Sequence, residues 1–410
     1  MILGCVADDF TGASDAASFL QAGGANVILS NGIPEREDED ILEAQAVIIA
    51  LKTRTCPPGE AVDRSMAAFS WLKAHGARML YFKYCSTFDS TESGNIGPVL
   101  DAALKRWDIP YTLLCPALLE NGRSVKDGNL YVNGVLLEDS PMKDHPLNPM
   151  RDSRLKYLME RQSRYPCFNL GAGELEREFR PYEKTGHYYL IPDYYEEKHG
   201  RMIAEQYGNL PLLSGGSGLL RMIARTWEPD EERNVHTPSR CTAPIILAGS
   251  CSEATRTQIR YYESKGGASL RIHPSGLCRA SRQWNTSGHS WKKIKDQAAL
   301  VYTSAPPDEV NHIKKQSGGS PTRPWNIITR NYWPGQLPMP WNLEEKNHSS
   351  RRGDVRRRHA ETGNAHLLYR TIHCSGVPVM YPARQEGMEL ILKSGNFGQE
   401  DFFIRAARDI

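Results

Sequence analysis

The sequence predicts an α/β protein of two domains, each a mostly parallel sheet with helices on both faces, with a β-hairpin inserted in the first domain. Through the first half of the chain, apolar runs of strand length alternate with amphipathic segments of helix length, which is typical of a parallel sheet. A fresh strand–glycine–helix pattern then follows a polar linker. The length of 410 residues suits two or three domains.

The composition of the chain argues against several classes of protein and several kinds of binding partner. The formal net charge of +2 gives no overall attraction to nucleic acid or to a membrane surface. No apolar run approaches the ~20 residues of a membrane helix, and the start of the chain lacks a signal-peptide pattern. The nine cysteines are scattered without metal-ligand spacing, so we expect reduced thiols, a cytoplasmic location and no assignable metal ligands. Small molecules are the expected partners, and the sequence leaves open whether the protein forms a homo-oligomer.

The expected strands of the first domain are short and apolar, and helical patterns follow several of them. A helix after the first strand would start at Thr11, which can act as its N-cap. Strands are expected at Ile2–Ala7, Ala25–Leu29, Ala46–Leu51, Met79–Phe82, Tyr111–Cys115 and Tyr188–Ile191, and helices at Glu60–Ala74, Ile96–Trp107 and Leu155–Gln162.

A hairpin and a linker divide the chain further. Residues 129–138 alternate around Asn133-Gly134, a strong signal for a two-residue hairpin beside the main sheet. Residues 229–242 are polar and charged and read as a linker between domains at 1–228 and 243–410. In the second domain, strands are expected at Ile245–Ala248 and Ala298–Thr303.

Charged and hydroxyl side chains follow three successive strands. In an open α/β sheet, ligands bind beyond the carboxyl ends of the strands, where these side chains would meet. A guanidinium and an ammonium suit a small carboxylate ligand, and a carboxylate suits proton removal from a hydroxyl. Two other interpretations stay open: a solvated charged loop, and an aspartate that only caps the following helix. The residues are Asp8, Asp9, Arg54, Lys83, Tyr84, Cys85, Ser86 and Thr87.

Glycine turns indicate anion sites in the second domain. Gly249–Ser252 lies between an expected strand and helix, where unpaired backbone N–H groups attract phosphate. Ser394–Gly398 follows another apolar run, and its glycines let the backbone approach a nucleotide. Gly215–Gly218 lacks the lysine and spacing of a Walker A motif and is interpreted as a hinge or tight turn.

Several strings together resemble the four-carbon acid sugar kinases, most closely the 3-oxo-tetronate kinase branch, over about three quarters of the chain. They are ADDFTGASDAA, ALKTRT, KYCSTFDSTESGNIGPV, PALLENGRSVKDGNLYVNGVLL, GGSGL, GSCSEATRTQ and LKSGNFGQEDFF. The resemblance implies a substrate domain at 1–228, a nucleotide domain at 243–410, and phosphorylation of the terminal hydroxyl of a 3-oxo-tetronate with ATP and Mg²⁺.

The resemblance also implies roles for individual residues. Asp8, Asp9, Arg54 and the strip Lys83–Thr87 would hold the acid sugar, with Asp9 or Asp8 orienting or deprotonating its hydroxyl. The ATP site would be lined by Ser252, Gly395, Asn396 and Gly398. Two alternatives from other classes remain: a non-catalytic acid-sugar-binding protein that retains only the first domain, and a lyase acting on the same acids.

One element of the family is missing from this sequence. The nucleotide domain of the family carries a strand that ends in GGETSGA, whereas residues 317–374 here lack sustained periodicity. Codons can be chosen for Ser349–His359 that give HRGGETSGAV when read one base later. We infer that a frameshift, from a sequencing error or a decayed gene, opens near Gln316 and closes near Ser375. Residues 317–374 are therefore expected to be irregular, and ATP turnover by this chain to be poor or absent.

Overall fold

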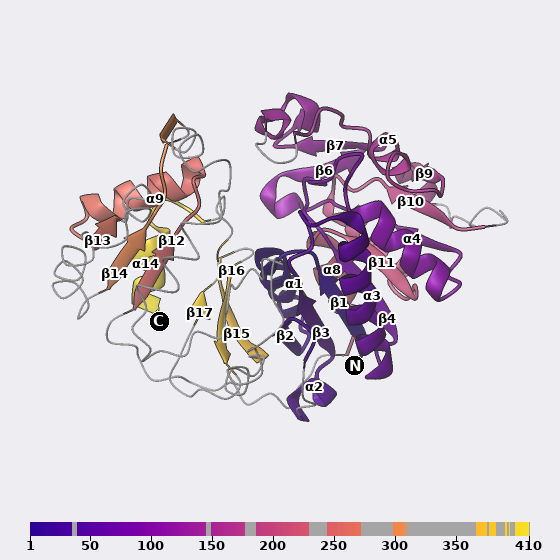
Figure 1. The fold of residues 1–410 in the computed structure, drawn as a ribbon, viewed down its shortest axis with the longest axis horizontal. Helices are drawn as coiled ribbons and strands as arrows, with labels where there is room; N and C mark the ends of the chain where they lie inside the picture. Colours follow the sequence, from indigo (N-terminus) through magenta and orange to yellow (C-terminus); the bar gives the residue numbers. More distant parts are fainter. Residues whose placement is uncertain are drawn as a thin grey trace, which may run out of the picture. The chain divides into compact units, whose positions relative to one another are not determined.

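The computed structural model forms two compact units. It describes residues 1–34, 39–144, 149–176, 186–228, 244–271, 298–306, 308–309, 366–374, 377–382, 390–391, 393 and 398–409. Unit 1 comprises Met1–Val235 and His366–Ala383, and unit 2 comprises His236–Ala365 and Arg384–Ile410 (Figure 1). Each unit contains a parallel sheet with helices packed on it, which confirms the predicted α/β class.

The main sheet of unit 1 is built on the first strand of the chain. Its strands lie in the order β11-β4-β1-β3-β2-β15-β16. Neighbours pair in parallel from β11 to β2, and β15 and β16 add an antiparallel edge. The bounds are β1 (Leu3–Ala7), β2 (Val27–Asn31), β3 (Ala46–Ala50), β4 (Met79–Lys83), β11 (Leu212–Gly215), β15 (His366–Cys374) and β16 (Val377–Pro382).

Helices cover both faces of this sheet, so its central strands are apolar throughout. Every residue of β1, β3 and β4 is buried, as expected for strands with no solvent-facing side. Helix α1 contacts α8, and α3 contacts α4; Figure 1 shows α1 and α3 on either side of β1. The helices of unit 1 are α1 (Phe10–Ala22), α2 (Glu39–Glu43), α3 (Pro58–Ala74), α4 (Ile96–Arg106), α5 (Leu155–Glu160), α6 (Ala172–Leu175), α7 (Glu197–Tyr207) and α8 (Gly218–Ala224).

The strand order places a switch point between β1 and β4. From β1 the chain moves outward through α1 to β2, and from β3 it returns across β1 through α3 to β4. Right-handed crossovers put these two connections on opposite faces of the sheet. The crevice between the carboxyl ends of β1 and β4 is therefore the expected ligand site of this sheet.

Two small sheets complete unit 1. One has the order β5-β10-β9 and the other β6-β7-β8. The predicted hairpin turn is confirmed, because Asn133 and Gly134 have φ of 52° and 83° between β7 and β8. A second hairpin, which we did not predict, turns at Asp127-Gly128 with φ of 51° and 71°. The bounds are β5 (Tyr111–Leu113), β6 (Arg123–Lys126), β7 (Asn129–Val132), β8 (Val135–Leu136), β9 (Cys167–Leu170) and β10 (Tyr188–Pro192).

Unit 2 contains a parallel sheet in the order β12-β14-β13. Helix α14 packs against α9 and β12, with Phe402 and Phe403 buried. The bounds are β12 (Ile245–Ala248), α9 (Glu253–Ser264), β13 (Ala268–Arg271), β14 (Ala299–Tyr302), β17 (Leu390–Ile391) and α14 (Phe402–Asp409).

The structure differs from the sequence expectation at residues 366–374. We expected irregular backbone up to Cys374, but His366–Cys374 form β15, whose first residues pair with β2 and whose length pairs with β16. Backbone hydrogen bonding to an exposed sheet edge supplies the partners that make this segment a strand. Residues 317–365 lie outside the described residues.

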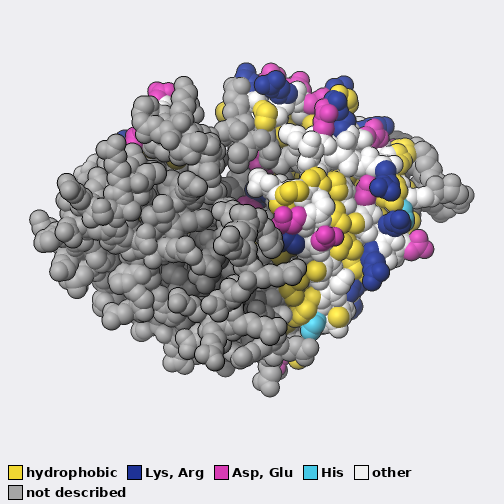
Figure 2. Space-filling view, viewed as in Figure 1, with side chains coloured by type: hydrophobic (Ala, Val, Ile, Leu, Met, Phe, Trp, Pro, Cys, Tyr) yellow, Lys and Arg dark blue, Asp and Glu magenta, His cyan; other side chains and the backbone are white. Residues whose placement is uncertain are grey.

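The surface of the described residues carries both signs of charge. Figure 2 shows Lys and Arg side chains intermingled with Asp and Glu on the visible face. This agrees with the small net charge of the chain. In the part of the chain that the structure describes, no helix has both the length and the apolar character to cross a bilayer.

Candidate active site

The switch point of unit 1 holds a partly buried cluster of one arginine and two aspartates. The Arg54 guanidinium donates to Asp8 through Nε (3.0 Å to Oδ2) and Nη2 (2.7 Å to Oδ1). It also donates to Asp9 through Nη1 (3.1 Å to Oδ2) and Nη2 (2.8 Å to Oδ1). Arg54 therefore binds both carboxylates in the two-pronged geometry that suits a guanidinium.

The ends of three adjacent strands position this cluster. The backbone N–H of Asp8 donates to the carbonyl of Lys83 (3.0 Å), and the N–H of Thr53 donates to the carbonyl of Asp8 (2.9 Å). The Asn95 side chain then fixes the loop that carries Arg54, since its Nδ2 lies 2.6 Å from the Thr53 carbonyl and 3.0 Å from that of Cys56. The predicted convergence of strand ends is thus present in the structure.

Asp9 also caps helix α1, which corrects the predicted N-cap at Thr11. Its extended backbone (φ −146°, ψ 165°) precedes the helix, and its carboxylate accepts from the N–H of Gly12 (2.8 Å). The Thr11 hydroxyl donates to the same carboxylate (2.8 Å). A carboxylate at this position satisfies an unpaired N–H and favours the positive end of the helix dipole.

The two aspartates differ in their electrostatic environment. Burial raises the pKa of the Asp8 carboxyl, against the attraction of Arg54. Burial acts in the same direction on Asp9, but the attraction of Arg54 and Lys83 and the bonds from Thr11 and Gly12 outweigh it and lower its pKa. Asp9 is therefore the firmly ionised partner, and Asp8 holds a proton more readily.

The Lys83–Thr87 strip continues from β4 along this edge of the sheet. Lys83 is 3% exposed, and its Nζ donates to the Tyr84 carbonyl (2.9 Å). A Cβ on Gly12 would lie 3.2 Å from that Nζ, so the glycine leaves room for the ammonium beside α1. Tyr84 is fully buried with its hydroxyl 3.4 Å from Ser214 Oγ, and Cys85 Sγ lies 2.9 Å from Thr87 Oγ1.

The remaining residue of that strip, Ser86, lies against the glycine-rich turn after β11. A Cβ on Gly216 would lie 3.4 Å from Ser86 Cβ and 2.6 Å from the Pro116 carbonyl. The close backbone approach explains why glycine occupies this position. The predicted tight turn at Gly215–Gly218 thus joins β11 to α8 beside the predicted site.

We did not predict a role for Asp15 and Ser217, which meet at the same edge. The Ser217 hydroxyl donates to Oδ2 of Asp15, and Asp15 Oδ1 is buried with no hydrogen-bond partner in the part of the chain that the structure describes. Burial raises the pKa of the Asp15 carboxyl to about 6, although Lys83 and the bond from Ser217 act against the increase. The sequence did contain a signal for this role. Asp15 is a charged residue among the small residues Ala13, Ala16 and Ala17, on a helix face that is otherwise apolar.

In unit 2, the predicted nucleotide residues lie around α9. Ser252 is the N-cap of this helix and accepts from the N–H of Thr255 (3.2 Å). The Gln258 side chain donates to the Gly398 carbonyl (2.9 Å), so Gly398 lies beside the helix. Lys393, which we did not predict, places its Nζ 3.3 Å from Thr255 Oγ1. Gly395 and Asn396 lie outside the described residues.

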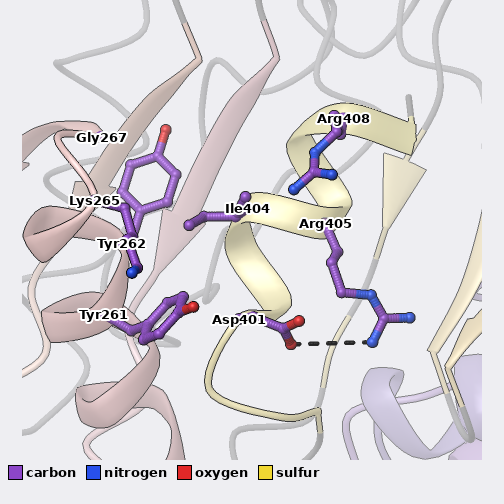
Figure 3. Close-up of a pocket in the computed structure, with 8 residues that line it drawn as sticks. All are labelled: Tyr261, Tyr262, Lys265, Gly267, Asp401, Ile404, Arg405 and Arg408. Carbon is purple, nitrogen blue, oxygen red and sulfur yellow. Dashed lines mark ion pairs between the residues drawn. The ribbon is translucent and has the colours of Figure 1, made fainter.

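A pocket of about 410 Å³ lies at the opposite end of α9, against α14 (Figure 3). Its lining includes Tyr261 and the basic residues Lys265, Arg405 and Arg408, and Arg405 pairs with Asp401 at 4.0 Å. Ser252 is at the start of α9 and Tyr261 is in its last turn, so this pocket is separate from the predicted ATP residues.

The described residues offer a limited donor set for metal ions. None of them form a group of three or more His, Cys, Asp and Glu side chains that could hold a metal ion. Magnesium that accompanies a nucleotide is usually held by one or two carboxylates together with the phosphates, so it requires a smaller protein contribution.

Comparison with known proteins agrees with this fold and site. The family described as "Sugar-binding N-terminal domain" matches residues 3–223, which contain the whole arginine–aspartate cluster. A protein of Salmonella typhimurium LT2 has the same fold, with a TM-score of 0.73, 31% identity and 99% of both chains covered. A Haemophilus influenzae protein of the family DUF1537 matches with a TM-score of 0.70, 29% identity and 98% coverage of both chains.

Relatives matched over most of their length share one name. The 3-oxo-tetronate kinase of Brucella melitensis biotype 1 is 35% identical over 100% of this chain and 95% of its own. The 3-oxo-tetronate kinase of Escherichia coli K12 is 42% identical over 77% of this chain and 84% of its own. The chain is therefore an α/β protein with a sugar-binding N-terminal domain. It belongs to the 3-oxo-tetronate kinase family.

Removing Arg54 should destabilise unit 1 far more than removing the whole cluster. Arg54→Met leaves the buried Asp8 and the partly exposed Asp9 without their shared cation, and leaving such a group unsatisfied costs about 1–3 kcal/mol. The triple variant with Asp8→Asn and Asp9→Asn removes the uncompensated charges and should regain most of that loss. Urea unfolding, with amide hydrogen exchange of β1 and β3, measures both; equal stability of wild type and Arg54→Met would contradict the prediction.

Ionisation of Asp15 should make unit 1 less stable as the pH rises. Its folded pKa of about 6 lies above the unfolded value, so the stabilisation is complete below about pH 4 and is lost as the pH passes 6. Asp15→Asn should therefore gain up to about 3 kcal/mol relative to wild type between pH 4 and 7. Urea unfolding at both pH values tests this, with the exposed Asp63→Asn as control. A difference that is independent of pH would exclude Asp15 as the titrating group.

Proposed function

We propose that this chain is built as an ATP-dependent kinase that phosphorylates the terminal (4-) hydroxyl of 3-oxo-tetronate. The observation that carries the proposal is the 35% identity to a 3-oxo-tetronate kinase over 100% of this chain and 95% of that relative. The cluster of opposite charges at the switch point of a sugar-binding domain is consistent with a small charged substrate. A cytoplasmic location belongs to the same proposal.

Each unit has its own role in this proposal. Residues 1–228 bind the acid sugar, residues 229–242 link the two parts, and residues 243–410 bind ATP. Support for the nucleotide part comes from the N-terminus of α9, where backbone N–H groups and the nearby Lys393 ammonium can hold phosphate oxygens. Ser252 and the turn at Gly395, Asn396 and Gly398 complete the proposed ATP site.

The chemistry assigned to the described residues is mainly positioning and charge balance. Phosphoryl transfer requires an aligned acceptor hydroxyl and neutralisation of phosphate charge. Asp9 or Asp8 orients that hydroxyl or accepts its proton, and Lys83 balances the nearby negative charge. Bound Mg²⁺ supplies charge neutralisation on the ATP phosphates.

We also infer that the nucleotide part is damaged in this sequence. Residues 317–374 replace the family string GGETSGA with an Arg-, Asn-, Pro- and Trp-rich stretch that a one-base shift can explain. Loss of a single donor to transition-state charge costs about 3–4 kcal/mol in other enzymes, so loss of a whole turn should abolish turnover.

Restoring the reading frame should restore kinase activity. A coupled ADP assay with 3-oxo-tetronate compares this chain with a version whose codons for Ser317–Cys374 are read in the family frame. We expect turnover only in the restored version, whereas calorimetry should detect acid-sugar binding in both. Equal turnover in the two would refute the frameshift, and no turnover or binding in either would refute the kinase assignment.

Asp9 should be required for turnover in the frame-restored protein. Asp9→Asn retains one oxygen that can accept from the Gly12 N–H but removes the charge, and loss of an acid–base group lowers the rate by about 10²–10⁴-fold. The exposed Asp63→Asn on α3 is the matched control and should retain the wild-type kcat. Full kcat in Asp9→Asn would transfer the proposed role to Asp8.

A further inference from the structure

Asn95 occupies the position that normally caps a helix, but its side chain does not cap α4. Asparagine is among the best residues at this position, because its side-chain oxygen can accept from an N–H of the first helical turn. Here the Asn95 side chain makes no cap hydrogen bond. Its Oδ1 is buried with no hydrogen-bond partner among the described residues, and the whole residue is 7% exposed. Contacts outside its own helix must therefore orient this side chain.

Another segment caps the start of α4. Gln162 lies just after α5, and its Oε1 accepts from the N–H of Gly97 (3.0 Å) and from the hydroxyl of Ser90 (3.0 Å). Gly97 is the second residue of α4, and Pro98 after it has no N–H that needs an acceptor. Gln162 thus supplies the acceptor that Asn95 does not, which leaves the Asn95 carboxamide available for another contact.

That contact is with the loop after β3, which carries Arg54. Asn95 Nδ2 lies 2.6 Å from the carbonyl oxygen of Thr53, 3.2 Å from that of Arg54 and 3.0 Å from that of Cys56. Three carbonyls around one nitrogen define the orientation of the carboxamide. On its other side the loop is bound to the end of β1, where the N–H groups of Thr53 and Arg54 donate to the Asp8 carbonyl (2.9 and 3.2 Å). The backbone that carries the guanidinium is therefore held from two sides.

Asn95 is also the last residue of the loop after β4, which begins with most of the Lys83–Thr87 strip. One side chain thus joins the two loops that carry predicted substrate residues. We propose that Asn95 is a positioning residue for the acid-sugar site: it holds the Arg54 loop against the loop after β4, and substrate affinity depends on that contact. The inference rests on the proposed function for the substrate. Misplacement of a binding group by about 1 Å can cost on the order of 10²-fold in an enzyme site.

Substitution of Asn95 in the full chain separates this contact from helix capping. Asn95→Ser and Asn95→Asp both remove the amide donors, and both new side chains are good N-caps, so α4 keeps a favourable start. The matched control is Val99→Ala, which creates a cavity at a fully buried position of the same helix and removes no polar group. Isothermal calorimetry measures 3-oxo-tetronate binding, and thermal denaturation measures stability, for wild type and the three variants.

Asn95→Ser should weaken 3-oxo-tetronate binding by at least about tenfold. Asn95→Asp should weaken it at least as much, because a carboxylate would face three carbonyl oxygens. Val99→Ala should melt below wild type and bind the ligand as wild type does. Affinity of either Asn95 variant within about threefold of wild type, or an equal loss in Val99→Ala, would overturn the proposal. Failure of both Asn95 variants to fold would show a purely structural role and would overturn it as well.

The Arg54 side chain supplies a second readout that needs no ligand. Its Nε and Nη2 donate to Asp8 at 3.0 and 2.7 Å, so the guanidinium should give a distinct NMR resonance, assigned by its absence in Arg54→Lys. That resonance should shift or broaden in Asn95→Ser and keep its wild-type position in Val99→Ala. An unchanged resonance in Asn95→Ser would overturn the proposal. Failure of wild type to bind 3-oxo-tetronate would instead refute the proposed function, and the Arg54 resonance would still decide whether Asn95 positions this side chain.

Discussion

The paired contact of Arg54 with Asp8 and Asp9 is the interaction on which the edge of the main sheet depends. Two adjacent carboxylates at the end of a fully buried strand would repel each other, and the buried Asp8 could not be hydrated well. The Arg54 guanidinium, from the loop after β3, binds both carboxylates and holds that loop against the end of β1. The strand order β4-β1-β3 makes this contact local, since all three ends meet at one point.

This pairing separates the polar groups of unit 1 into two sets. The bonds among Asp8, Asp9 and Arg54 are made within the protein, and Asp9 also serves as a helix cap. Among the described residues, Lys83 hydrogen-bonds a neighbouring carbonyl, and one buried oxygen of Asp15 finds no partner there. The first set gives the site a fixed shape, and the second contains the groups with remaining hydrogen-bonding capacity. A buried polar atom without a partner is costly, so such groups are informative about ligands.

Much of this arrangement was predictable from the sequence, because it depends on local patterns. The apolar runs gave β1, β3 and β4 within a residue or two, and parallel pairing brought Asp8 and Lys83 to one edge as expected. The sequence could not show that Arg54 would satisfy both aspartates, because side-chain geometry decides between a protein and a substrate carboxylate. The bond between Asp15 and Ser217 spans 202 residues and has no local signature. The Asp127-Gly128 turn did have one, and the hairpin there was predictable.

Strand β15 shows how a sheet edge can accept a segment that carries no family motif. Its pairing with β2 is antiparallel at the edge of an otherwise parallel sheet, and the pairing consists of backbone hydrogen bonds. Such bonds are available to any sequence without proline at the paired positions, and β2 would otherwise present an open edge. The register with β16 shifts twice, between Tyr369 and Thr371 and between Ile372 and Cys374. A glycine turn that binds phosphate requires defined backbone angles, so a change of reading frame would destroy that turn while a paired edge strand could persist.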